Sequence, residues 1–213
     1  MIDLIKQFID FVLHIDKHLI ELASQYHQWT YLIIFLIVFC ETGLVIMPFL
    51  PGDSLLFAAG ALCATGALNI WVLIIGVFSA AVLGDNINYV VGKFIGRKVS
   101  EGNGRFIKKD YITRTEKFYE KHGGKALIMA RFAPILRTFA PFVAGAGRME
   151  YPRFLTYCIV GNLLWVNIFC LVGYLFANNE FVKNNFSVVV LGIIFVSLIP
   201  VVLAWWKSRK TAN

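Results

Sequence analysis

The feature that most constrains this chain is a set of long stretches without a single Asp, Glu, Lys or Arg. The four longest cover residues 22–40, 54–84, 154–179 and 184–206. A helix needs about 20 apolar residues to cross a hydrocarbon core roughly 30 Å thick. Only 15% of the residues are charged, against about 25% in a typical soluble domain. The sequence therefore predicts an all-α polytopic membrane protein and argues against a soluble enzyme.

The positive charges are concentrated beside these apolar stretches. The net charge is +7, and ten of the twenty Lys and Arg residues lie between Lys93 and Lys125. A second basic cluster, at 207–210, closes the chain. Basic segments next to membrane spans are typical of the cytoplasmic side. We therefore expect a cytoplasmic segment at 97–125, a cytoplasmic C-terminus and no nucleic-acid partner.

The N-terminal segment has a different pattern from the rest of the chain. Polar residues recur at helical spacing over residues 3–22, among Leu, Ile, Phe and Val. Such a helix lies in the membrane interface rather than across it. We expect an amphipathic helix within residues 1–28.

Residues 126–147 are predicted to form a re-entrant hairpin. They are apolar except for Arg131 and Arg137, and Pro134 and Pro141 interrupt them. If this segment enters and leaves on the cytoplasmic side, the basic residues after it and the basic C-terminal tail all lie on that side. A single crossing would place them outside, against the charge rule.

Residues 29–66 repeat the pattern with acids in place of the arginines. The acids are Glu41 and Asp53, and the helix breakers between them are Pro48, Pro51 and Gly52. Each predicted hairpin precedes an apolar span, at 70–96 and 154–179, and a last span follows at 184–206. Glycines 12 residues apart also recur in the two spans that follow the hairpins, namely Gly84 with Gly96 and Gly161 with Gly173. We therefore expect one membrane domain over 1–213, built as an inverted repeat of hairpin plus span, an architecture of secondary transporters.

Four charges lie inside the predicted hairpins. A charge at the bilayer centre costs about 2.5–3.5 kcal/mol on insertion scales, so four of them suggest a function. Arginine suits phosphate, which makes Arg131 and Arg137 candidate phosphate ligands. Carboxylates in a low-dielectric site can take up a proton, which makes Glu41 and Asp53 candidates for proton coupling. The two hairpins are expected to meet at the midplane, where these acids face the arginines. The alternative is that the four residues form two ion pairs that only hold the hairpins together.

Asp85 is a fifth candidate, within the predicted 70–96 helix. It is expected to act either as a proton-relay carboxylate or as a hydrogen-bonded packing residue. Asn162, Trp165 and Asn167 in the later span are interpreted as packing residues that form interhelical hydrogen bonds.

No enzyme motif is present in the sequence. There is no HExxH motif, Walker loop or Ser-His pairing, and the four cysteines lie in apolar stretches without a CxxC pair. We expect no enzymatic activity, no cofactor and no metal site.

Three motifs resemble those of the DedA family, also called the VTT or SNARE-associated Golgi domain. The first runs from Glu41-Thr42-Gly43 to Pro48-Phe49-Leu50-Pro51-Gly52-Asp53-Ser54. The second comprises Gly84-Asp85, Tyr89 and Gly92, and the third comprises Arg131-Phe132-Ala133-Pro134, Arg137, Pro141 and Ala144-Gly145, with Met149 after it. The similarity extends over nearly the whole chain, and none of the charged positions departs from it.

The resemblance implies a more specific function than the residues do. Family members are bacterial inner-membrane proteins with two re-entrant hairpins facing each other. Some recycle undecaprenyl phosphate and others move or scramble phospholipids, and proton dependence is associated with the family. The family's essential acids and arginines correspond to Glu41, Asp53, Arg131 and Arg137.

We therefore expect a proton-coupled lipid transporter of the bacterial inner membrane, a flippase for undecaprenyl phosphate or a related lipid phosphate. Its expected partners are membrane lipids and protons, and homo-oligomer formation is left open. The alternatives are a phospholipid flippase or scramblase, a small-ion/proton antiporter, and a non-transporting scaffold protein. The antiporter would leave the two arginines without a role.

Overall fold

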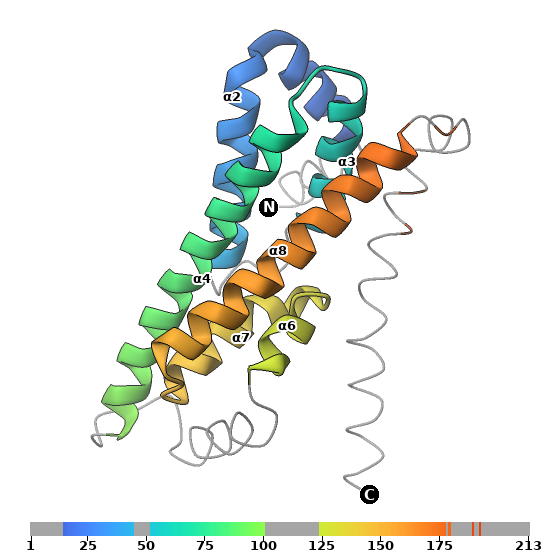
Figure 1. Cartoon of the computed structure of the whole chain (residues 1–213). Helices are drawn as coiled ribbons and strands as arrows, with labels where there is room; N and C mark the ends of the chain where they lie inside the picture. Colours follow the sequence, from blue (N-terminus) through green and yellow to red (C-terminus); the bar gives the residue numbers. More distant parts are fainter. Residues whose placement is uncertain are drawn as a thin grey trace, which may run out of the picture. The chain divides into compact units, whose positions relative to one another are not determined.

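The computed structural model describes residues 15–44, 52–100 and 124–177, with the single residues Asn179, Val189 and Gly192. Side chains are described from Gln28 onward, except those of residues 98–100, 134 and 135. The described residues form six helices and no strand (Figure 1). These helices are α2 (Ile15–Gly43), α3 (Gly52–Ala64), α4 (Ile70–Ser100), α6 (Lys125–Ala130), α7 (Pro134–Ala146) and α8 (Tyr151–Phe176).

The helical class is confirmed, and each of the two central spans corresponds to one long helix. Helices α4 and α8 are long and apolar enough to cross a membrane. The predicted boundaries are less accurate, because α4 continues to Ser100, inside the segment expected at 97–125, and α8 begins at Tyr151. Helix α2 runs without a break across the boundary expected between residues 28 and 29. Residues 15–42 contain neither proline nor glycine, so no helix breaker ends the helix at that boundary.

Several predicted features lie outside the described residues. These are residues 1–14 of the predicted N-terminal amphipathic segment, the breakers Pro48 and Pro51, residues 101–123 of the basic segment, and the last span at 184–206 apart from Val189 and Gly192. They stay predictions.

The start of α4 follows from its local sequence. Gly66 adopts φ 82°, a conformation that glycine tolerates without steric cost, in the turn after α3. Asn69 then caps the helix, because its side-chain oxygen accepts the backbone N–H groups of Trp71 and Val72 at 2.9 and 3.3 Å. The Asn69 backbone N–H donates to the Tyr31 hydroxyl at 2.6 Å, which connects the turn to α2.

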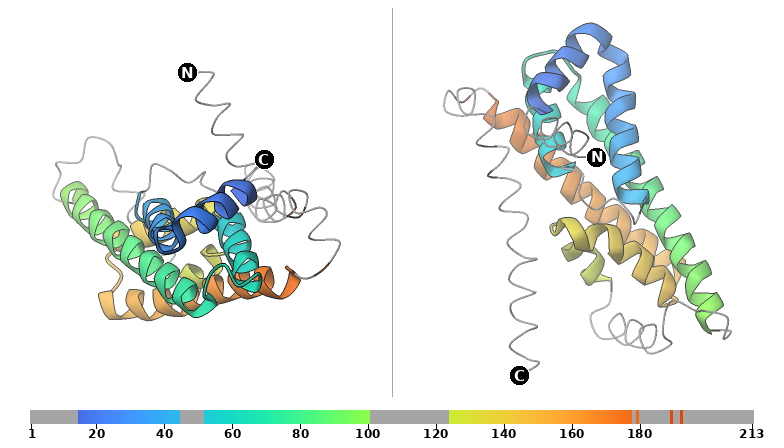
Figure 2. Two further views of the ribbon diagram at one scale, coloured as in Figure 1. Left: turned by 90° about the horizontal axis from the view of Figure 1, so that it is seen from above. Right: turned by 180° about the vertical axis from the view of Figure 1, so that it is seen from behind.

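A proline separates α6 from α7. Ala133 is extended, with φ −124° and ψ 111°, as expected for a residue that precedes a proline. The chain therefore reverses after α6 and resumes as α7 at Pro134 (Figure 2, right). Arg131 ends α6 and Arg137 lies in the first turn of α7, so the two arginines flank the break. This segment therefore consists of two short helices on either side of Ala133. The re-entry of residues 126–147 on the cytoplasmic side stays a prediction.

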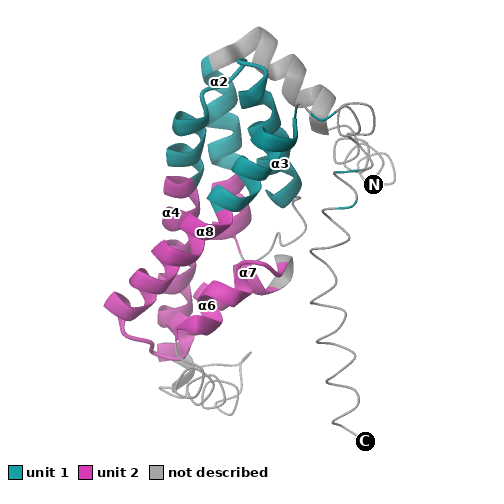
Figure 3. Cartoon of the chain, turned by 45° about the vertical axis from the view of Figure 1, so that its right-hand side comes forward, with its two compact units in different colours: residues 1–37, 51–77, 166–213 teal, residues 38–50, 78–165 magenta. Residues whose placement is uncertain are grey.

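The structure divides into two compact units (Figure 3). Unit 1 comprises residues 1–37, 51–77 and 166–213. Unit 2 comprises residues 38–50 and 78–165. Helices α2, α4 and α8 each contribute to both units.

In unit 1, α3 packs closely against the C-terminal part of α8. All residues of α3 from Gly52 to Cys63 are buried. A Cβ atom added at Gly60 would collide with the carbonyl of Cys170, and one at Gly173 would collide with the carbonyl of Phe57. Only glycines allow the two backbones to approach this closely, as is common between helices in membranes.

In unit 2, α7 packs against α4 in the same manner. A Cβ atom at Gly92 would collide with the Phe142 carbonyl, and one at Gly145 would collide with the Tyr89 carbonyl. In both units, each carbonyl belongs to the residue three positions before the partner glycine. Gly173 in unit 1 therefore has the role that Gly92 has in unit 2. The glycines that recur 12 residues apart in the sequence are not the ones that correspond in these contacts.

The polarity of unit 2 is inverted relative to a soluble protein. Arg137 and Thr138 are buried in α7, whereas Leu136 and Phe139 are 49% and 37% exposed. Helix α8 likewise exposes Leu163 and Leu164 while Asn162 is fully buried. Charged groups inside and apolar groups outside are the arrangement expected for a protein surrounded by lipid.

Candidate functional site

The ionisable residues singled out in the sequence are all buried. Glu41 and Asp85 are 0% exposed, Arg131 and Arg137 are 2% exposed, and Asp53 is 4% exposed. Four of the five lie in unit 2, and Asp53 lies in unit 1, in the first turn of α3. The four charges of unit 2 sum to zero, with two arginines against two carboxylates.

Arg131 forms a bidentate ion pair with Asp85. Its Nη1 atom donates to Asp85 Oδ1 at 2.9 Å, and its Nη2 atom donates to Asp85 Oδ2. The same Oδ2 atom accepts a hydrogen bond from the Asn162 side-chain amide at 2.7 Å and one from the Cys158 thiol at 3.1 Å. Three side chains, from the α6–α7 connection and α8, therefore donate to one carboxylate on α4.

Arg137 forms the second ion pair, with Glu41 at the end of α2. Its guanidinium also lies over the ring of Trp165, 4.8 Å from the ring centroid. An arginine over the face of an indole gains a favourable cation–π interaction. The carboxylate and the ring fix the direction of this guanidinium.

The elements that carry the two pairs are held together by Asn88. Its side-chain amide donates to the Thr42 carbonyl on α2 and to the Thr138 carbonyl on α7, the latter at 3.2 Å. Gly84 allows α4 to approach Thr42, because a Cβ atom there would collide with the threonine hydroxyl. Short segments of α2, α4 and α7 therefore converge at the ion pairs.

The pairing differs in part from the sequence expectation. We expected the hairpin acids Glu41 and Asp53 to face the arginines, and the structure pairs Arg137 with Glu41 but Arg131 with Asp85. Asp85 is both buried and hydrogen-bonded. Of the predicted breakers, Gly52 begins α3, Pro134 begins α7 and Pro141 lies inside α7.

Sequence reasoning underrated three residues of α8 that contact the buried charges. Cys158, Asn162 and Trp165 are fully buried, and two of them were interpreted only as packing residues. Their spacing of four and three residues places them on one helical face. Because an asparagine is costly to bury in an apolar span without a partner, its position on that face was the available signal.

Chemically, this arrangement offers two guanidinium groups in a buried, neutral cluster. Each could exchange its carboxylate for another oxyanion, because the arginine fork matches carboxylate and phosphate alike. In the described part of the chain, His, Cys, Asp and Glu side chains do not gather in threes as a metal site would require.

Comparison with known proteins assigns the family. Residues 50–175 match the VTT domain. Protein DedA of Escherichia coli K12 is 49% identical over 213 residues, which cover 99% of this chain and 97% of the relative. The chain is a member of the DedA family of VTT-domain membrane proteins.

Two more distant relatives agree with this DedA-family assignment. An uncharacterized membrane protein of Mycobacterium leprae is 46% identical over 83% of this chain and 80% of its own length. Inner membrane protein YghB of Escherichia coli K12 is 32% identical over 91% of this chain and 84% of its own length. No solved structure is significantly similar to the chain.

Proposed function

We propose that this DedA-family protein is a proton-coupled translocase of a lipid phosphate, with undecaprenyl phosphate as the first candidate substrate. The observation that supports this most directly is the pair of buried arginines in unit 2, each held by a carboxylate. The family resemblance supplies the lipid, since some family members recycle this carrier.

Substrate binding is proposed as an exchange of oxyanions. The two oxygens of Asp85 occupy the positions that two phosphate oxygens would take on the Arg131 fork. Arg137, fixed over Trp165, would bind a further phosphate oxygen once Glu41 is displaced. The lipid tail stays in the bilayer, along the apolar side chains that unit 2 exposes.

The proton coupling follows from charge balance. A phosphate monoester carries about −1.5 to −2 charges at pH 7. Because the cluster is already neutral, adding this charge to a low-dielectric site is unfavourable unless the carboxylates take up protons. Glu41 and Asp85 would be the acceptors in unit 2, and Asp53 would take up a proton in unit 1.

The topology proposed for this mechanism is an inverted repeat of two re-entrant hairpins, each followed by a span. The reciprocal glycine contacts of α3 with α8 and of α7 with α4 support it, because both follow one pattern. The basic clusters support a multi-pass inner-membrane protein with its C-terminus in the cytoplasm.

Binding of undecaprenyl phosphate to the purified protein by native mass spectrometry tests the proposal. Phosphatidylethanolamine and phosphatidylglycerol serve as competing lipids. We expect the wild type to bind undecaprenyl phosphate more tightly than either competing lipid, and this preference to be lost in Arg131→Ala/Arg137→Ala. Arg131→Lys should bind weakly, because it keeps the charge but lacks the two-pronged geometry.

Arg153→Ala is the matched control, since Arg153 is 72% exposed and pairs only with the surface residue Glu150 among the contacts described. It should bind as the wild type does. Equal, weak binding of all three lipids that persists in the double variant would overturn the arginine–phosphate site. Lipid-phosphate binding without any flipping in reconstituted vesicles would overturn the transport role.

A further inference from the structure

A basic pocket lies in unit 2, apart from the buried ion pairs. Its volume is about 370 Å³, within the range of small-ligand sites. Among its lining residues in the described part of the chain, three are basic, Lys93 and Arg97 on α4 and Arg148 between α7 and α8, and one is acidic, Glu150. Glu150 is itself engaged by Arg153 at 3.2 Å. The pocket therefore carries an excess of positive charge.

The backbone at Arg148 is unusual for a non-glycine residue. Its φ is 52°, in the left-handed region that favours glycine at the end of a helix. Its N–H donates to the Gly145 carbonyl at 3.2 Å, and the Met149 N–H donates to the Ala144 carbonyl at 3.0 Å, which closes α7. Glycine would adopt this conformation more easily. We therefore infer that the Arg148 side chain has a function other than closing the helix.

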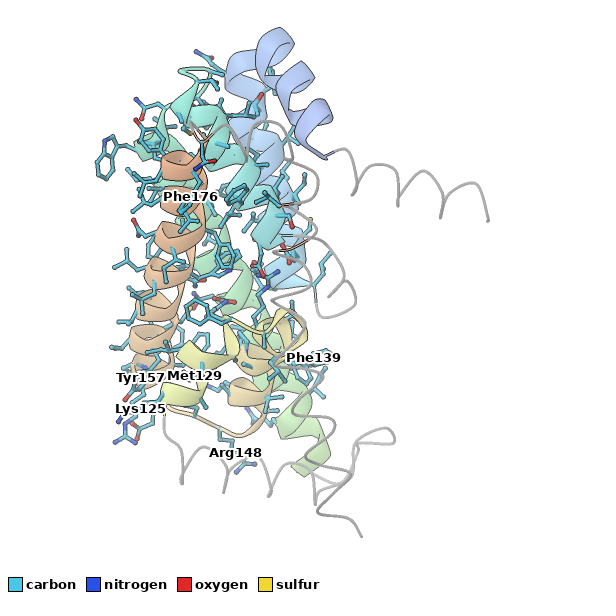
Figure 4. All side chains as sticks on the ribbon, turned by 90° about the vertical axis from the view of Figure 1, so that its right-hand side faces the viewer. Lys125, Met129, Phe139, Arg148, Tyr157 and Phe176 are labelled. Atoms are coloured by element: carbon cyan, nitrogen blue, oxygen red, sulfur yellow. The ribbon has the colours of Figure 1, made fainter. Side chains whose placement is uncertain are left out.

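The aromatic side of the pocket is held in place by hydrogen bonds. The Tyr89 hydroxyl donates to the Met149 carbonyl, and the Tyr89 ring stacks on Phe154 with centroids 4.3 Å apart. The Tyr151 hydroxyl donates to the side-chain oxygen of Asn86 at 2.9 Å. The pocket is therefore formed without a ligand. Figure 4 shows Arg148 at the end of the hairpin, and Lys125 separate from it.

An exposed apolar stripe on α4 leads to the basic residues. It consists of Leu83, Ile87, Val90 and Phe94, each at least 45% exposed. Their spacing of four, three and four residues keeps them on one face, and Arg97 follows three residues later. The apolar span ends at this arginine, where basic side chains typically reach the membrane interface.

We propose that this pocket, the interfacial basic pocket, binds the phosphate-bearing headgroup of an anionic membrane lipid, whose acyl chain lies along the α4 stripe. The three cations and the start of α8 at Tyr151 attract the phosphate, and the stripe distinguishes a lipid from a free anion. This site does not depend on the proposed translocation, because none of its lining residues takes part in the buried ion pairs.

Three probes test the proposal on the full-length protein in a neutral detergent. They are dioctanoyl phosphatidylglycerol, dioctanoyl phosphatidylcholine and inorganic phosphate, each titrated by microscale thermophoresis. We expect the phosphatidylglycerol to bind most tightly, and its affinity to fall about tenfold or more in Lys93→Gln/Arg97→Gln, as expected for loss of charge-assisted contacts. Lys125→Gln is the matched control, because Lys125 is exposed and does not line the pocket.

Arg148→Gly separates binding from folding. Glycine fits the left-handed backbone, so the melting temperature should stay the same or rise while affinity for phosphatidylglycerol falls. Equal affinity in all variants would overturn the pocket, and inorganic phosphate binding as tightly as the lipid would overturn its lipid specificity. The Arg131→Ala/Arg137→Ala protein should still bind phosphatidylglycerol, so loss of that binding would also contradict an independent site.

Discussion

Units 1 and 2 have the same glycine-mediated helix packing but bury different sets of charged residues. In each, a 13-residue helix lies against a longer apolar helix, with glycines on both sides of the contact. In each, the glycine faces the carbonyl of the residue three positions before its partner glycine. Of the described charged residues, however, unit 1 buries only Asp53, whereas unit 2 buries two arginines and two carboxylates.

The surroundings of the two short helices differ accordingly. Helix α3 is buried on all sides, and its acid lies in the first turn, where the helix dipole favours a negative charge. Helix α7 is amphipathic in the inverted sense, with Arg137 inside and Leu136 outside. The glycine-mediated packing therefore does not require buried ion pairs. This argues that the ion pairs of unit 2 serve binding or proton transfer rather than the fold.

Removing one member of a buried pair should produce the largest effect. Asp85→Leu leaves the buried Arg131 without its carboxylate, which typically costs about 3–5 kcal/mol of unfolding free energy. Thermal unfolding in detergent measures this loss. The double variant Asp85→Leu/Arg131→Leu should recover most of the stability, since replacing a whole buried pair by apolar residues is often neutral.

The double variant also separates stability from function. It should fold and yet lose the preference for undecaprenyl phosphate over phosphatidylglycerol, because one of the two guanidinium groups is gone. If it stays as unstable as Asp85→Leu, the fold itself needs the pair, and the contrast between the two units fails.

Because both units share this glycine-mediated packing, a Gly→Ala substitution at the contact should destabilise the protein equally in either unit. Gly173→Ala in unit 1 and Gly92→Ala in unit 2 each force a methyl group against a carbonyl, so each should destabilise the protein by about 1–3 kcal/mol. Gly76→Ala on α4 is the control, because its added Cβ meets nothing within 4 Å. It should be neutral or stabilise the helix by up to about 1 kcal/mol.

Melting temperatures of the three variants in one detergent give the comparison. A large loss in only one unit would show that the glycine contacts of the two units are not equivalent. Loss of stability in Gly76→Ala would indicate an effect of alanine unrelated to helix contact.

The pH dependence of lipid-phosphate binding tests how the carboxylates are used. Protonation of Glu41 releases Arg137, so the affinity of the wild type should rise as the pH falls. Glu41→Gln mimics the protonated state, and it should bind about tenfold more tightly at high pH and show a flatter pH profile. Asp53→Asn, in unit 1, should leave the profile of binding unchanged and reduce transport.

These profiles are measured by titrating undecaprenyl phosphate between pH 6 and pH 9. An unchanged pH profile in Glu41→Gln would remove Glu41 from the coupling step. A flattened profile in Asp53→Asn would mean that the binding chemistry is not confined to unit 2.

Features that depend on neighbouring residues could be predicted from the sequence, whereas a pairing between residues far apart in the chain could not. Local rules explain the turn before α4 and predicted the break at Pro134, because glycine and proline act on the backbone next to them. Charge in an apolar stretch identified Glu41, Arg131 and Arg137 as buried sites. The partner of Arg131 could not be predicted, since Asp85 is 46 residues away and its choice over Asp53 depends on how α4 and the α6–α7 hairpin pack.

The smallest predicted effect concerns a polar contact of unit 1 that serves the fold alone. Asn69→Ala removes the cap of α4 and should cost about 1 kcal/mol of unfolding free energy, because the Trp71 and Val72 N–H groups lose their acceptor. Asn69→Asp keeps an acceptor oxygen and should retain the stability, which makes it the matched control. Binding of undecaprenyl phosphate by native mass spectrometry should be the same in both variants, since Asn69 contacts none of the buried charges in unit 2. A selective loss of binding in Asn69→Ala, with little loss of stability, would contradict the confinement of lipid-phosphate binding to unit 2.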